Sequence, residues 1–106
     1  MQELISKILK NAADNITNIS NDNKIISKIE QVVLLCVKAY GNNQRILFCG
    51  NGGSASDAQH IAAELSGRFL RDRKPLFAEA LHVNSSYLTA VSNDYGFEYS
   101  YSRILE

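Results

Sequence analysis

The chain has 106 residues, of which 45% are hydrophobic and 21% are charged, a composition typical of one globular domain and unlike that of a disordered chain. Its 11 basic and 11 acidic residues cancel and no long basic run is present, which argues against nucleic acid as the primary ligand. No apolar stretch approaches the length of a membrane span, and the first residues lack a secretory pattern, so we expect a cytoplasmic protein without a membrane partner.

Two helices are predicted at the start of the chain. Apolar residues recur every three or four positions in residues 4–19 and again in residues 25–37, which places them on one face of each helix. Asn, Ser and Asp are frequent in residues 18–23 and predict a break between the helices. The broad second stripe indicates either an oligomer interface or an ordinary helix–helix contact. We expect residues 1–43 to form a helical oligomerisation segment and residues 44–106 to begin an α/β core.

The most informative segment joins the apolar run 45–49 to a glycine-rich turn, 50–53, and then to a helix-forming sequence. Ligands bind at such strand–loop–helix junctions in α/β proteins. Ser54 is expected to cap the helix, with Asp57 completing a capping box and Gly67 ending the helix. The spacing fits neither a dinucleotide fingerprint nor a P-loop. Exposed backbone N–H groups are therefore predicted to hold a phosphate, a carboxylate or a sugar oxygen, the alternative being a tight turn that merely needs glycine.

The second half of the chain predicts one more strand and further helical segments. Residues 76–83 are interpreted as a strand with His82 as a structural residue within it, 87–91 as a short helix and 93–96 as a turn. Tyr101 is interpreted as a core or interface aromatic. The order of elements predicts parallel pairing of the two strands. Because so few strands make a poor sheet and the apolar pattern runs to the end of the chain, we expect the N-terminal part of a longer protein, or a sheet completed by a partner.

His60 and Glu64 lie one helical turn apart and are expected to face the same way. An imidazole and a carboxylate at this spacing can bind Zn²⁺, or Glu64 can remove a proton from a carbon next to a carbonyl; an ordinary hydrogen-bonded surface pair is the alternative. We expect the Glu64 carboxylate to lie beside the glycine turn. Arg68 is a candidate to hold that carboxylate ionised or to contact substrate, and Asn93 and Asp94 are candidates to bond sugar hydroxyls. Their alternatives are a surface salt bridge and a simple turn.

Taken together, residues 49–69 and 80–97 resemble the sugar isomerase (SIS) domains of the phosphoheptose isomerase family, and the stretch 50–64 is the most specific part. The resemblance implies an α/β fold, a doubly wound three-layer sandwich with a parallel sheet and two leading N-terminal helices. It also implies a homotetramer in which those helices pack between subunits. The implied reaction converts sedoheptulose 7-phosphate to D-glycero-D-manno-heptose 7-phosphate, towards ADP-heptose and the lipopolysaccharide inner core.

The resemblance also assigns roles to individual residues. It places four neighbours in the substrate site: Asn51, Gly52, Gly53 and Ser54. Glu64 would contact the substrate and act as the base that forms an enediol, while His60 and Glu64 would supply ligands to one Zn²⁺ per subunit. Asn93 and Asp94 would hold the sugar. The serine-rich phosphate loop of such proteins, and the later Gln and His that would complete the metal site and the acid/base pair, are not among these residues. We therefore expect this fragment alone to be inactive.

Two other functions remain open. SIS domains also serve as non-catalytic binding proteins, either as sugar-phosphate sensors or as tetramers that contact the replication initiator. Such proteins can keep the glycine loop and lose the acid, so Glu64 favours the enzyme. A purely structural four-helix oligomer would leave the glycine loop unexplained.

Overall fold

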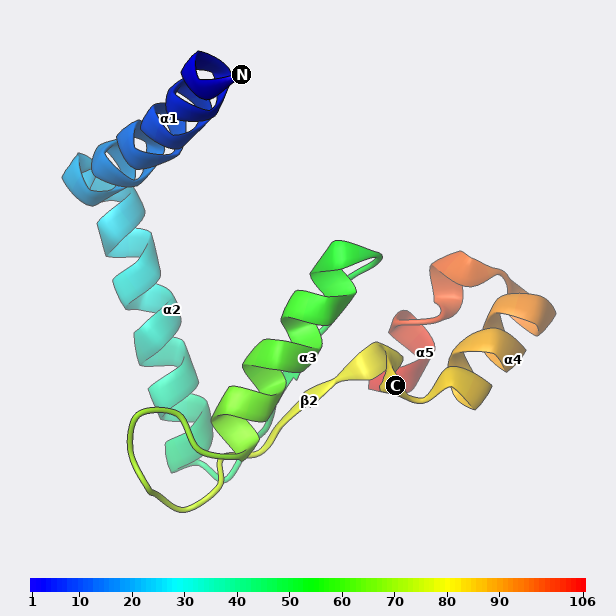
Figure 1. Cartoon of the computed structure of the whole chain (residues 1–106). Coiled ribbons are helices and arrows are strands. Elements are labelled where there is room, and N and C mark those ends of the chain that lie inside the picture. Colours follow the sequence, from blue (N-terminus) through cyan, green and yellow to red (C-terminus); the bar gives the residue numbers. More distant parts are fainter. The chain divides into compact units, whose positions relative to one another are not determined.

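The computed structural model describes residues 1–106. The chain forms two compact units, residues 1–38 and 39–106. Figure 1 shows the elements in chain order. The helices and strands are α1 Gln2–Asn21, α2 Asn23–Gly41, β1 Ile46–Phe48, α3 Gly53–Ser66, β2 Ala78–Ala80, α4 Ser85–Tyr95 and α5 Ser102–Leu105. Short 3₁₀ turns cover Leu81–Val83 and Phe97–Tyr99.

The break between α1 and α2 is a single residue, Asp22. The Asp22 carboxylate accepts hydrogen bonds from the backbone N–H groups of Lys24 at 2.8 Å and Ile25 at 3.2 Å. These N–H groups have no partner within the first turn of a helix, so the carboxylate caps α2. The predicted break is confirmed, but α1 continues to Asn21 and uses most of the polar segment that the sequence assigns to the break.

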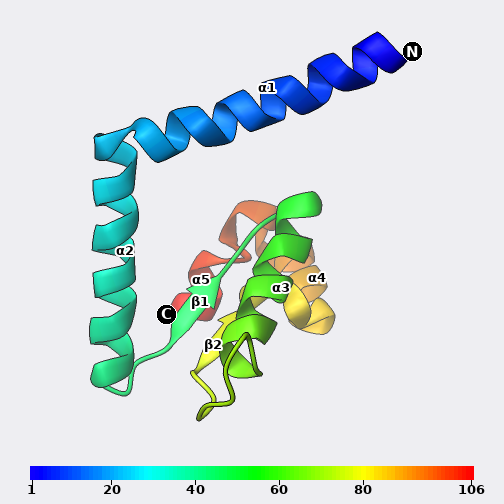
Figure 2. The same ribbon diagram turned by 60° about the vertical axis from the view of Figure 1, so that its left-hand side comes forward.

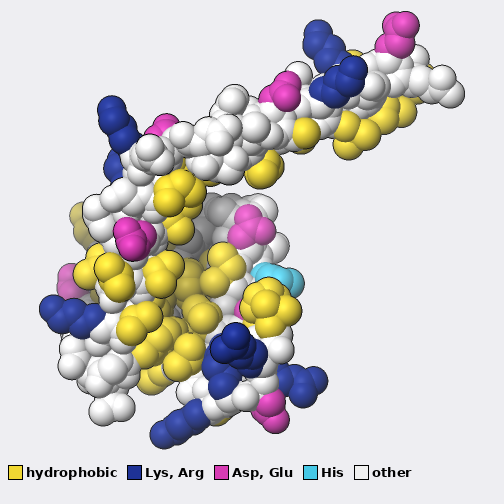
Figure 3. Space-filling view, turned by 90° about the vertical axis from the view of Figure 1, so that its left-hand side faces the viewer, with side chains coloured by type: hydrophobic (Ala, Val, Ile, Leu, Met, Phe, Trp, Pro, Cys, Tyr) yellow, Lys and Arg dark blue, Asp and Glu magenta, His cyan; other side chains and the backbone are white.

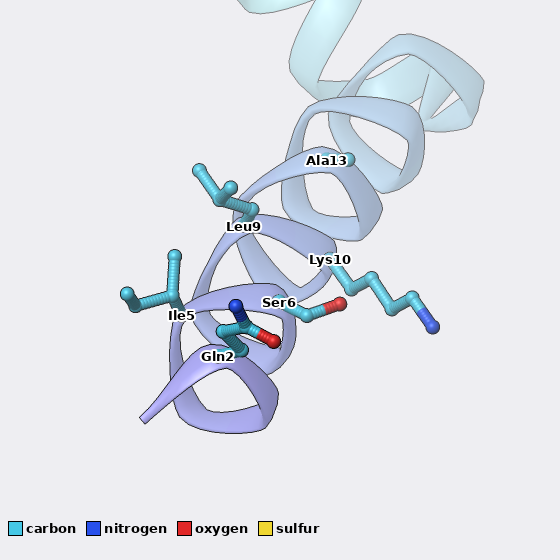
Figure 4. A pocket seen from close by; sticks show the side chains of 6 residues that line it. All are labelled: Gln2, Ile5, Ser6, Leu9, Lys10 and Ala13. Carbon is cyan, nitrogen blue, oxygen red and sulfur yellow. The ribbon is translucent and has the colours of Figure 1, made fainter.

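The first unit leaves its apolar side chains exposed. Neither α1 nor α2 buries a single residue, and Leu9 and Ile16 of α1 are 65% and 68% exposed. In Figure 3, α1 carries charged side chains along one edge and hydrophobic ones along the other. Figure 4 shows Ile5 and Leu9 on one side of α1 and Lys10 on the opposite side, around a shallow hollow. No helix in the chain combines the length and the apolarity needed to cross a membrane.

The second unit is built around a two-stranded parallel sheet. β1 and β2 pair with Ile46 opposite Ala78 and Phe48 opposite Ala80, and α3 packs against both strands (Figure 2). In β2 the two alanines are buried while Glu79 between them is exposed, as the alternation of side chains along a strand requires. The predicted α/β class, with a parallel sheet after two leading helices, is confirmed.

Small side chains form the core between α3 and β2. The core consists of Ala58, Ala62, Ala78 and Ala80, with Phe48 and Leu65 packed against it. Because alanine presents only a methyl group, the helix backbone can approach the sheet closely. This packing fixes the side of α3 that faces the sheet and leaves the side that carries His60 outward.

Two predictions for the second half of this unit are wrong. β2 ends at Ala80, so His82 lies in the following 3₁₀ turn instead of in a strand. Asn93 and Asp94 lie in the last turn of α4 and not in a turn of their own. The Asn84 side chain accepts a hydrogen bond from the Tyr87 N–H at 3.0 Å, so α4 begins at Ser85. The helix runs to Tyr95, with Gly96 as its C-cap.

Candidate functional site

The glycine-rich turn connects the C-terminal end of β1 to the first turn of α3. α3 begins at Gly53 with Gly52 as its N-cap, and Gly52 adopts φ 57° and ψ −123°, a conformation that residues with a side chain rarely adopt. No side chain caps α3. The Ala55 N–H bonds to the Gly52 carbonyl oxygen at 3.2 Å, so the N–H groups of Gly53 and Ser54 remain available to an anionic or polarised ligand. The expected strand, glycine loop and helix are confirmed.

Ser54 does not cap α3 as the sequence predicts. Because the N-cap is Gly52, two residues before the predicted cap, Ser54 is already inside the helix. Its hydroxyl accepts a hydrogen bond from the Asn51 N–H at 2.9 Å and donates one to the Asn51 carbonyl oxygen at 2.8 Å. The Ser54 hydroxyl therefore holds both backbone polar groups of Asn51 and stabilises the conformation of the loop.

The closest backbone approach in the loop is at Gly50. A Cβ atom at this position would lie 2.4 Å from the Ser54 carbonyl oxygen and 2.5 Å from its carbonyl carbon. At Gly53, in contrast, a Cβ atom would meet no atom within 4 Å. The loop thus requires glycine most strictly at Gly50, on steric grounds, and no feature of the sequence distinguishes this glycine from its neighbours.

A tyrosine from the C-terminal segment reaches the same loop. The Tyr101 hydroxyl donates a hydrogen bond to the Gly50 carbonyl oxygen at 2.8 Å and lies 3.1 Å from Asn51 Oδ1. The sequence interpretation of Tyr101 as a core or interface aromatic misses this contact. The residues lie about fifty positions apart, and no local pattern connects them.

His60 and Glu64 face the same way on α3, as predicted. His60 Nε2 lies 3.5 Å from Glu64 Oε1, and the two side chains are 76% and 35% exposed. Both groups are therefore accessible to a ligand or a metal ion from outside the chain.

Arg73 holds the C-terminal end of α3, and the expected pairing of Arg68 with the Glu64 carboxylate does not form. Arg68 forms no ion pair with Glu64. Arg73 instead donates hydrogen bonds to the carbonyl oxygens of Glu64 at 3.0 Å and Leu65 at 2.8 Å. A cationic group that satisfies the last carbonyls of a helix stabilises that end, so Arg73 fixes the turn from which Glu64 projects.

The glycine loop and the acid lie at opposite ends of α3. Glu64 lies 11 positions after Gly53 in one continuous helix, which at 1.5 Å per residue is about 16 Å along the axis. The expectation that the Glu64 carboxylate lies beside the glycine turn of its own chain is wrong. It treats a residue three helical turns away as a neighbour of the loop.

The His60–Glu64 pair fits two positions of a zinc site. Imidazole nitrogen and carboxylate oxygen are both zinc ligands, and a tetrahedral site takes three or four ligands from protein. Within residues 1–106 no group of three or more His, Cys, Asp or Glu side chains is placed to hold a metal ion. The pair suits a site whose other ligands come from outside these residues.

Asn93 and Asp94 form a separate polar pair. The Asn93 Nδ2 group donates a hydrogen bond to Asp94 Oδ1 at 3.1 Å, and both residues are exposed. Neither side chain bonds to the loop 50–54. The structure thus brings Asn51, Ser54 and Tyr101 together at one end of α3, and His60 and Glu64 together towards the other.

Comparisons with known proteins agree on one family. The SIS domain family matches residues 1–106. The chain is 49% identical over 90 residues to the phosphoheptose isomerase of Mycobacterium bovis (strain BCG / Pasteur 1173P2), covering 85% of this chain and 46% of the relative. It is 46% identical over 103 residues to that of Rhodospirillum rubrum, covering 97% and 53%.

Solved structures give the same result. The phosphoheptose isomerase of Neisseria gonorrhoeae superposes with a TM-score of 0.75 at 38% identity, over 96% of this chain and 53% of that one. For the phosphoheptose isomerase from Francisella tularensis the TM-score is 0.80 at 32% identity, over 95% and 53%. The chain spans about half the length of the relatives it matches. With the parallel sheet, the leading helices and the glycine loop all in place, the chain belongs to the SIS domain family.

Proposed function

We propose that the protein containing this chain is an aldose–ketose isomerase that converts sedoheptulose 7-phosphate to D-glycero-D-manno-heptose 7-phosphate. The observation that carries the proposal is the accessible Glu64 carboxylate, one turn from His60 on the helix that the glycine loop begins. Relatives named phosphoheptose isomerase support the choice of substrate. The product would feed ADP-heptose and lipopolysaccharide inner-core synthesis in the cytoplasm.

The reaction needs a base at carbon and a second acid/base group that carries the proton between the two oxygens, and it moves no atom other than hydrogen. The second group would come from outside residues 1–106. Glu64 would remove a proton from C1 of the ketose, and the C2 carbonyl oxygen would gain a proton, which gives the enediol. Return of a proton to C2, with loss of the C1 hydroxyl proton, gives the aldose. Asn51, Gly52, Gly53 and Ser54 would bind and orient the sugar phosphate, and Asn93 and Asp94 would hold its hydroxyls.

The distance between the glycine loop and Glu64 calls for a second copy of the chain. We propose a homotetramer in which Glu64 of one copy serves a substrate that is bound by the glycine loop of another. The exposed apolar sides of α1 and α2 support assembly through these helices, because apolar surface of this extent is normally covered by a partner.

Zinc is the metal that the donor set suits. His60 and Glu64 would hold it together with ligands from outside residues 1–106, and bound zinc would supply polarisation of the substrate carbonyl.

Replacing His60 by Ala is expected to lower zinc affinity at least about tenfold without unfolding the protein, because the His60 side chain is 76% exposed. Elemental analysis of the purified full-length protein measures zinc content per subunit. Gln59→Ala, at the adjacent exposed position of α3, is the matched control. Equal zinc in both variants would leave His60 without a role in metal binding.

The proposed activity is tested directly on the full-length protein with zinc supplied. Incubation with sedoheptulose 7-phosphate is expected to produce aldose anomeric proton signals in the NMR spectrum at a rate that depends on protein concentration. Absence of turnover in a protein that still forms its tetramer and binds the sugar phosphate would overturn the isomerase and favour a non-catalytic binding module.

A further inference from the structure

The glycine loop is held by a residue from the far end of the chain. Tyr101 joins the loop through the Gly50 carbonyl oxygen at 2.8 Å and Asn51 Oδ1 at 3.1 Å. Within residues 1–106, these are the only side-chain hydrogen bonds that link the loop to an element outside β1, α3 and the loop itself.

Tyr101 is itself well anchored. Its ring meets the ring of Phe97 edge to face, with centroids 6.2 Å apart and an angle of 80° between the planes, a favourable aromatic geometry. The preceding residue, Ser100, is only 1% exposed, and its hydroxyl lies 2.9 Å from the Ser92 hydroxyl of α4. The chain just before the tyrosine is therefore fixed within the second unit, which limits the freedom of the hydroxyl to leave the loop.

Asn51, in contrast, is exposed, and the hydrogen bond of its side chain is to the Tyr101 hydroxyl. A hydroxyl group carries one proton, and the shorter bond to Gly50 takes it. If the Asn51 carboxamide is rotated by half a turn, its NH₂ group faces the tyrosine oxygen. The Tyr101 hydroxyl then donates to the Gly50 carbonyl oxygen and accepts a hydrogen bond from the Asn51 NH₂ group. In that orientation the amide oxygen of Asn51 is left to accept a hydrogen bond from a sugar hydroxyl.

We propose that Tyr101 is a positioning residue for the substrate loop, whose hydroxyl fixes the Gly50 carbonyl and the Asn51 carboxamide in the orientation that binds the sugar. This inference rests on the proposed function for the identity of the ligand, but not for the contact itself. Without the hydroxyl, Asn51 regains rotamer freedom that substrate binding must then remove.

The test is Tyr101→Phe in the full-length protein, with Tyr99→Phe as the matched control. Phe keeps the ring contact with Phe97 and removes only the hydroxyl group. We expect KM for sedoheptulose 7-phosphate to rise about tenfold, which corresponds to the loss of one or two modest hydrogen bonds, while kcat changes less than about threefold. Tyr99, which is 50% exposed and whose hydroxyl makes no hydrogen bond, should behave as the wild type does.

A second measurement separates the loop contact from the ligand. Without substrate, amide hydrogen exchange at residues 50–54 is expected to speed up in Tyr101→Phe and not in Tyr99→Phe. The wild-type protein could show no isomerase turnover while amide exchange at residues 50–54 still speeds up in Tyr101→Phe. In that case the proposed function fails and the positioning role of Tyr101 stands.

In an Asn51→Ala background, adding Tyr101→Phe should raise KM by a smaller factor than it does alone, because part of its effect runs through Asn51. The same KM and loop exchange in Tyr101→Phe as in Tyr99→Phe would overturn the inference. A fall in kcat with KM unchanged would also overturn it, because the hydroxyl would then act on the reacting atoms.

Discussion

Replacing Glu64 by Gln is expected to lower kcat for sugar isomerisation by about 10²–10⁴-fold, the range that one acid/base group contributes. Gln has the same size and retains a side-chain oxygen, but it cannot take the C1 proton. The fold should be unaffected, since the Glu64 side chain is 35% exposed and its neighbouring polar side chain is His60 at 3.5 Å. The Arg73 bonds that hold this turn go to backbone carbonyls, so they remain in the variant.

The measurement combines steady-state kinetics with thermal unfolding and zinc analysis. Glu30→Gln, an identical change at an exposed position in α2, is the control and should retain full turnover. Unchanged kcat in Glu64→Gln would remove this residue as the base. Loss of turnover together with loss of zinc would assign Glu64 to metal binding first, whereas loss of turnover at normal zinc content would assign it to proton transfer.

The parts of the site that follow from the sequence are local in the chain. An apolar run followed by glycines and a helix former predicts β1, the loop and α3, because each signal acts within a few residues. The facing of His60 and Glu64 follows in the same way from the helical repeat. The distance from the loop to Glu64 is equally predictable, because the sequence already predicts one helix from Ser54 to Gly67. The expectation that the carboxylate lies beside the loop overlooks the rise of that helix.

Other features depend on contacts that the sequence does not encode locally. Tyr101 meets Gly50 only because the chain returns to β1 after α4, and nothing in residues 97–106 indicates that partner. The role of Ser54 depends on where α3 begins, and the N-cap lies at Gly52, two residues before the predicted cap. α4 likewise continues through Asn93 to its C-cap at Gly96, where the composition favours a turn.

Gly50→Ala is expected to have the second large effect, through the shape of the loop. The added methyl group would lie 2.4 Å from the Ser54 carbonyl oxygen, and the obstructing atoms are backbone at the start of α3, which cannot rotate away. Forced displacement of this kind costs about 1–3 kcal/mol of unfolding free energy. It also moves the Asn51 backbone, which Ser54 holds at 2.9 Å and 2.8 Å, so KM for the sugar phosphate should rise steeply.

Gly53→Ala is the matched control, because a Cβ atom there meets nothing within 4 Å and the residue is the first of α3. Replacing glycine by alanine at a compatible position stabilises a protein by about 0.4–1 kcal/mol. The urea concentration at the midpoint of unfolding should therefore rise in Gly53→Ala and fall in Gly50→Ala. If Gly50→Ala unfolds at the same urea concentration as the wild type and keeps its KM, the close approach of the loop has no functional importance.

Combining the Gly50→Ala and Glu64→Gln chains in one assembly tests whether the loop and the acid that act on one substrate come from different copies of the chain. Co-expression of Gly50→Ala with Glu64→Gln should give mixed forms of the proposed tetramer. In the proposed arrangement, some sites of these mixed forms pair an intact loop from one copy with an intact Glu64 from another. If the roughly 16 Å between these groups in α3 is bridged by assembly, mixed tetramers should be more active than either parent. If activity stays at the level of the parents, loop and acid must act from the same chain, and a substrate path along α3 would have to replace the composite site.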